Sequence, residues 1–116
     1  VTEAVAAVRS YENVQAMLFN CSSTTSISAA LPLLREAAPS SVLLGAYANG
    51  FHTVKASGGG REDSSSEQSE YDGASTPEAY AEHAQLWVEQ GVEIIGGCCG
   101  IFPEHIHAIE CKIRRG

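Results

Sequence analysis

Three short apolar runs alternate with helical patterns along this chain, and this alternation restricts the fold more than any other feature. The runs have the length of strands and cover residues 15–20, 42–49 and 92–95. They are nearly continuously apolar, which is typical of parallel strands with both faces buried. Apolar residues at helical spacing flank them, at residues 2–11, 27–38, 76–90 and 103–113. This order predicts an α/β fold, with parallel strands that helices connect and cover on both faces.

The helix starts differ in how clearly the sequence marks them. Thr76 and Pro77 form a cap followed by proline at the first helical position, which is a strong start signal. Pro32 conflicts with the interior of the helix at 27–38, because a proline ring meets the carbonyl of the residue four positions earlier. A cap at Ser26 or Ser28 would place Pro32 near the first turn, so we expect the helix to begin there.

Polar and thiol side chains follow the predicted strands directly. Cys21 follows the first strand, Asn49 closes the second, and Cys98 and Cys99 follow the third. The carboxyl ends of parallel strands meet at one edge of a sheet, where the loops of α/β proteins carry functional groups. We therefore expect these four residues to converge.

Three thiols at one rim have the chemistry of an open zinc site, in which thiolates hold the metal and a fourth position stays free. Adjacent strand residues point to opposite faces, so Cys98 and Cys99 can both bind only if the backbone turns there. The neighbouring glycines allow such a turn. Spacing alone leaves two other interpretations open: inert buried thiols, or a redox pair formed by Cys98 and Cys99.

Composition excludes several classes of partner. The chain has 7 Lys and Arg against 14 Asp and Glu, a formal net charge of −7, which disfavours binding to nucleic acid. No apolar stretch is long enough to span a membrane, and the start resembles no signal peptide. The 4 cysteines lack the spacing of a disulfide scaffold, so we expect a cytoplasmic protein with reduced thiols. The histidines of the predicted helices should face solvent: His83, His105 and His107.

Two motifs give the chain a resemblance to a known family. The segment IGGCCG at residues 95–100, followed by PEHI at 103–106, closely resembles the C-terminal signature of the zinc-dependent homocysteine S-methyltransferases. Asn20 and Cys21 resemble the Asn-Cys element that precedes it in that family. The resemblance implies a (β/α)8 barrel, of which residues 1–116 would form the C-terminal part with strands six to eight.

The same resemblance implies a function and a set of site residues. Cys21, Cys98 and Cys99 match the family's zinc ligands, whereas Cys111 matches none. The implied reaction moves a methyl group from a small donor to the sulfur of homocysteine and yields methionine. Asn20, Tyr47 and Asn49 are the expected substrate-binding residues, although Ala48 stands where the family has proline between the last two.

Three strands make only part of a barrel, so we expect a fragment, or a chain that associates with itself or with the missing barrel portion through its sheet edges. Residues 55–75 are rich in glycine, serine and acids and predict a flexible loop. The alternative function is a non-catalytic zinc- or thiol-binding α/β domain that associates through the same edges.

Overall fold

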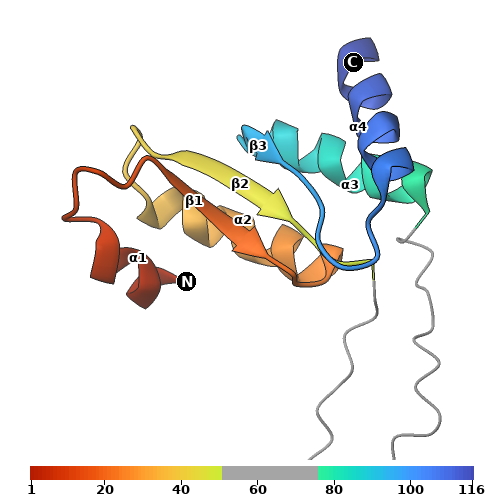
Figure 1. Ribbon diagram of the computed structural model, residues 1–116. Coiled ribbons are helices and arrows are strands. Elements are labelled where there is room, and N and C mark those ends of the chain that lie inside the picture. The colour runs from red at the N-terminus through yellow and green to blue at the C-terminus, as the bar shows by residue number, and fades with distance from the viewer. Residues whose placement is uncertain (51–75) are drawn as a thin grey trace, which may run out of the picture.

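The computed structural model describes residues 1–50 and 76–116, and the predicted loop at 55–75 lies outside these residues. Helices and strands alternate along the described part of the chain (Figure 1). The elements are α1 (Thr2–Val8), β1 (Ala16–Asn20), α2 (Thr24–Ala37), β2 (Leu43–Tyr47), α3 (Pro77–Glu89), β3 (Ile94–Ile95) and α4 (Pro103–Arg115). The predicted order of helices and strands is therefore confirmed.

The three strands form one parallel sheet in the order β1-β2-β3. In this register Asn20 pairs with Tyr47 at the carboxyl end of the sheet. β3 is shorter than predicted because the Val92 amide donates to the carbonyl of Trp87 and so belongs to the turn after α3. Beyond β3 the chain stays hydrogen-bonded to its neighbour. The Gly96 amide donates to the Ala46 carbonyl, and the Cys98 amide donates to the Ala48 carbonyl.

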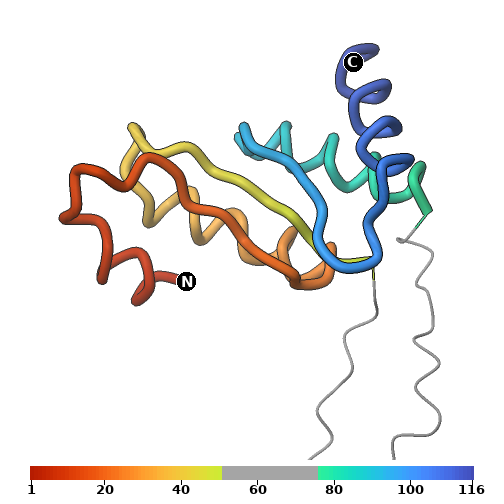
Figure 2. Tube along the Cα trace, in the orientation of Figure 1, coloured from red at the N-terminus to blue at the C-terminus, as the bar shows by residue number. Residues whose placement is uncertain are grey.

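In the described residues the helices cover a single face of the sheet, so the prediction of helices on both faces is wrong (Figures 1 and 2). Leu44, Ala46 and Ala48 of the second strand region are fully buried under the helices. The larger part of this core is built by α2 and α3, with Ile109 of α4, and its largest side chains are Trp87, Tyr80, Ile27 and Leu31. The other part joins Val5 of α1 to Leu34, Ala38 and Leu44.

The opposite face of the sheet is apolar and open. Leu18, Leu43 and Ile94 are 37%, 42% and 36% exposed, one on each strand. Leu18 lies over Gly45, where a Cβ atom would come within 2.4 Å of its side chain. The apolar side chains of the strands are thus buried on one face of the sheet only. The other face can pack against another polypeptide segment.

Two local predictions fail at helix starts. α2 is capped by Ser23, whose hydroxyl accepts a hydrogen bond of 3.1 Å from the Ser26 amide, so Pro32 lies inside the helix and not in its first turn. His105 is 4% exposed, although we expected it to face solvent. Its Nδ1 accepts a hydrogen bond from the Phe102 amide at 3.1 Å, which satisfies a free donor at the start of α4.

Candidate metal centre

Three cysteines from two separate loops meet at the carboxyl end of the sheet. The Sγ atoms of Cys21, Cys98 and Cys99 all lie within 4.8 Å of one another. Cys99 Sγ is 3.8 Å from that of Cys21 and 3.9 Å from that of Cys98. The expected convergence of these three side chains is therefore observed.

The spacing of the sulfurs fits a tetrahedral metal. With zinc–sulfur bonds of roughly 2.3 Å and tetrahedral angles, two thiolates on one zinc ion lie about 3.8 Å apart. Two of the three sulfur pairs already have this separation. The spacing is thus compatible with a metal ion held by the three thiols, and three protein ligands would leave a fourth position for another molecule.

Cys21 reaches the cluster through an unusual backbone conformation. Its φ is 45°, in the left-handed region that non-glycine residues rarely adopt. The Cys21 amide donates to the carbonyl of Tyr47 at 3.0 Å, and the Asn49 amide donates to the carbonyl of Ser22 at 3.0 Å. The Asn49 side-chain Nδ2 donates to the Cys21 carbonyl at 2.9 Å and lies 4.0 Å from its sulfur. The neighbouring strand end therefore holds this strained residue from both sides.

Cys98 and Cys99 reach the cluster together because the chain turns between them and the next residues. The Ile101 amide donates to the carbonyl of Cys98 at 3.1 Å, which closes a four-residue turn. Gly100 is the third residue of this turn and has φ of 75°, a conformation that favours glycine. Gly50 adds a bond from its amide to the Cys99 carbonyl at 2.8 Å. The backbone turn that joint binding requires is present.

Hydrogen bonds among the thiols shift the pKa values of Cys21 and Cys98 in opposite directions. The pKa of Cys21 lies below its usual value, mainly because the thiol of Cys98 hydrogen-bonds to its sulfur and secondarily because of the backbone at Cys99. The same bond to Cys21 raises the pKa of Cys98 to about 11, since it favours the protonated donor. The cluster thus favours deprotonation of Cys21 over that of Cys98.

The predicted substrate-binding residues lie at the same end of the sheet but in different environments. Asn49 contacts Cys21 directly, as described above. Asn20 is exposed and Tyr47 half-buried, and the two are paired across β1 and β2. Strand alternation places them on the open face with Leu18 and Leu43. The structure thus brings Asn49 against the thiols and sets Asn20 and Tyr47 beside each other on the uncovered side.

A buried tyrosine of α3 contacts the backbone beneath the cluster. Tyr80 of α3 is fully buried, and its hydroxyl donates to the carbonyl of Gly96 at 2.8 Å. The same hydroxyl accepts a hydrogen bond from the Ala48 amide at 3.0 Å. Burial raises the pKa of Tyr80 to about 12. A tyrosine in an apolar helix stripe is the only sequence signal for this contact, because its polar partners are backbone atoms.

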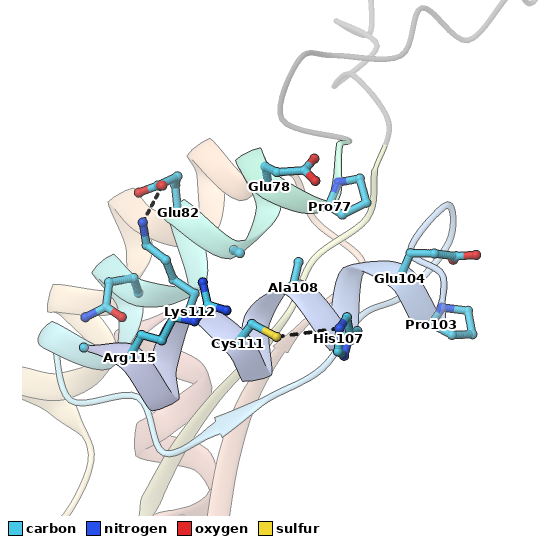
Figure 3. Close-up of a pocket in the computed structure, with 13 residues that line it drawn as sticks. Pro77, Glu78, Glu82, Pro103, Glu104, His107, Ala108, Cys111, Lys112 and Arg115 are labelled. Atoms are coloured by element: carbon cyan, nitrogen blue, oxygen red, sulfur yellow. Dashed lines mark hydrogen bonds and ion pairs between the residues drawn. The ribbon is translucent and has the colours of Figure 1, made fainter.

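A groove of about 1270 Å³ lies elsewhere, between α3 and α4 (Figure 3). It contains Cys111, whose sulfur is 3.6 Å from Nε2 of His107 on the same helix. An ion pair of 2.5 Å between Lys112 and Glu82 crosses from one helix to the other. Cys111 is therefore placed with a histidine on α4 and not with the three clustered thiols.

A family model described as homocysteine S-methyltransferase matches residues 1–113. The chain belongs to the homocysteine S-methyltransferase family. The resemblance drawn from the cysteine motifs is thereby confirmed, and the open parallel sheet is consistent with part of this family's barrel. Homocysteine S-methyltransferase YbgG of Bacillus subtilis (strain 168) is 41% identical over 44 residues. That match covers 38% of this chain and only 14% of the relative. No helix within residues 1–50 and 76–116 has the length and apolarity to cross a membrane.

Proposed function

We propose that this chain carries the zinc centre of a homocysteine S-methyltransferase, as the C-terminal part of its barrel. Cys21, Cys98 and Cys99 would hold Zn²⁺ and leave the fourth position to the sulfur of homocysteine. The observation that carries the proposal is the sulfur spacing of 3.8 and 3.9 Å in a member of this family. A small methyl donor would supply the group that is transferred, and methionine would be the product.

The chemistry depends on presenting sulfur as a nucleophile at neutral pH. Zinc, when bound, lowers the pKa of a coordinated thiol, so that the substrate is available as thiolate. The residues of this chain fix the three ligands in place: the turn at Cys98 and Cys99 aims two of them, and Asn49 holds the loop of the third. Cys99 is the exposed member of the set, so the cluster is accessible from outside the sheet.

The positions of the other site residues support roles in substrate binding. Asn20 and Tyr47 lie on the open face next to the strand ends that carry the cluster. An amide and a phenol there can hydrogen-bond the amino or carboxyl group of an amino-acid substrate. We assign them to substrate binding, and Asn49 to the support of Cys21 as well as to the substrate side of the site.

Metal binding and substrate binding can be tested one after the other. Metal analysis of the purified chain should give one zinc per chain, and cobalt substitution should give the charge-transfer bands of thiolate ligands. L-homocysteine should then change these bands, whereas L-homoserine, its oxygen analogue, should not. If homocysteine leaves the spectrum of the metal-loaded chain unchanged, the substrate assignment is contradicted.

Activity is a separate measurement. Methionine formation from homocysteine should be assayed with S-methylmethionine, S-adenosylmethionine and betaine as donors. A zinc-loaded chain that binds homocysteine but forms no methionine with any of them would limit this chain to the metal-bearing part of the enzyme.

The open sheet face favours a second candidate function. Leu18, Leu43 and Ile94 are exposed together on this face, and the outer edges of β1 and β3 are unpaired within the described residues. A non-catalytic zinc- or thiol-binding domain that associates through these surfaces would have the same features. Zinc binding without any response to homocysteine, even after association, would favour this alternative.

A further inference from the structure

We infer that the hydroxyl of Tyr80 is a positioning group for the three-cysteine cluster: it ties the end of β2 to the loop that carries Cys98 and Cys99. This inference rests on the proposed function only in requiring that the cluster binds metal. It assigns a role to a residue of α3 that is neither one of the proposed metal ligands nor one of the proposed substrate-binding residues.

The hydroxyl lies between two separate backbone segments. It donates to the carbonyl of Gly96, two residues before Cys98, at 2.8 Å. It accepts from the amide of Ala48, the residue before Asn49, at 3.0 Å. A single buried group therefore uses both its donor and an acceptor position to hold the carboxyl ends of two neighbouring strands at a fixed separation.

Both segments lead directly to metal ligands. The Ala48 carbonyl accepts from the Cys98 amide at 2.9 Å, so the residue held by Tyr80 itself holds a ligand. The next residue, Asn49, donates from its side chain to the carbonyl of Cys21. Displacement of Ala48 would thus move the support of two ligands that lie on different loops.

The ring of Tyr80 is fixed independently of its hydroxyl. It packs edge-on against Trp87 and His105, with ring centroids 5.9 Å apart in both pairs. Phenylalanine can keep these ring contacts, and it removes only the group that reaches Gly96 and Ala48. Tyr80→Phe therefore separates the positioning role from core packing.

The chain offers a matched control in the same layer. Trp87 is fully buried, and its Nε1 donates to the hydroxyl of Ser28 at 2.8 Å. Ser28→Ala removes one side-chain hydrogen bond from a core aromatic, as Tyr80→Phe does, but within residues 1–50 and 76–116 Ser28 has no hydrogen bond to a cluster residue. Comparison of the two variants therefore separates an effect on the cluster from a general loss of stability.

The test is the zinc affinity of the full chain, measured by competition with a chromophoric chelator, together with the cobalt spectrum. Tyr80→Phe should bind zinc 10- to 100-fold more weakly, the range typical for lost support of metal ligands, and should alter the cobalt bands. Ser28→Ala should stay within about threefold of the unaltered chain, because it touches only the core. Equal affinity in Tyr80→Phe and the unaltered chain, or equal losses in both variants, would overturn the inference while leaving the zinc proposal intact. An unaltered chain that binds no zinc would overturn both.

A second measurement uses the unaltered chain, in case Tyr80→Phe does not fold. Coupling between two sites is reciprocal, so zinc must stabilise the hydrogen bonds that stabilise its ligands. Adding zinc should slow hydrogen exchange at the Ala48 amide by about tenfold more than at the amide of Leu34, which lies in the other part of the core. Equal slowing at both amides would contradict the role of Tyr80.

Discussion

The side-chain amide of Asn49 donates a hydrogen bond of 2.9 Å to the carbonyl of Cys21, the single non-glycine residue with positive φ among residues 1–50 and 76–116. Such a conformation costs about 1–3 kcal/mol and persists only where neighbouring contacts enforce it. A strained residue of the three-cysteine cluster thus depends on a polar side chain that follows the next strand.

Removal of this support should weaken metal binding. We expect Asn49→Ala to lower zinc affinity by about tenfold, because Cys21 can then relax away from the other two sulfurs. Chelator competition measures this directly. Asn20→Ala is the control: it lies next to Cys21 but is exposed, and it should reduce the response to homocysteine with little change in zinc affinity. A larger loss of zinc affinity in Asn20→Ala than in Asn49→Ala would reverse the two assignments.

The four cysteines should divide into two groups. Cys21→Ala or Cys98→Ala should abolish stoichiometric zinc binding, since two thiolates hold the metal far less tightly than three. Cys111→Ala should leave the zinc content at one per chain, because this thiol lies in the groove between α3 and α4. Metal analysis after gel filtration distinguishes these outcomes. A similar loss in all three variants would refute the ligand assignment.

The topology of the sheet and the convergence of the cysteines could be predicted from the sequence, because both depend on local patterns. Continuous apolar runs predict parallel strands, and cysteines directly after such strands must meet at the carboxyl edge, as Cys21 and Cys98 do. The open face could not be predicted from the same pattern. Apolar residues such as Leu18 show that a strand can be buried on both faces, but not that the covering layer lies within this chain.

The errors at single residues have a common physical origin. Ser23, Ser26 and Ser28 are equivalent as caps in the sequence, and the three-dimensional path of the chain after Cys21 selects the first. His105 was expected in solvent because it lies in a helix away from the strand ends, yet its ring satisfies the Phe102 amide and packs on Tyr80. Contacts with backbone atoms, such as those of the Tyr80 hydroxyl, leave no trace in residue type.

Alkaline pH should reveal the burial of Tyr80. Its pKa is about 12 in the folded chain, against about 10 in the unfolded chain, so the folded state retains the proton longer. This preference stabilises the fold fully below about pH 10 and is lost as the pH rises toward 12, at a total of about 2–3 kcal/mol. Urea unfolding with excess chelator should show this extra loss between pH 9.5 and about 11.5 in the unaltered chain and less of it in Tyr80→Phe. The same pH dependence in both would mean that another group is responsible.

The open face of the sheet should determine the state of association. An apolar face with unpaired strand edges favours pairing with another chain, so we expect the purified chain to exceed the monomer mass in light scattering. Leu18→Lys places a charge on this face beside Gly45 and should shift the mass toward the monomer without loss of zinc. Leu33→Lys is the matched control, since Leu33 is equally apolar and 51% exposed but lies on α2, away from the sheet edges. A monomeric unaltered chain, or equal dissociation by both variants, would show that the open face does not mediate association.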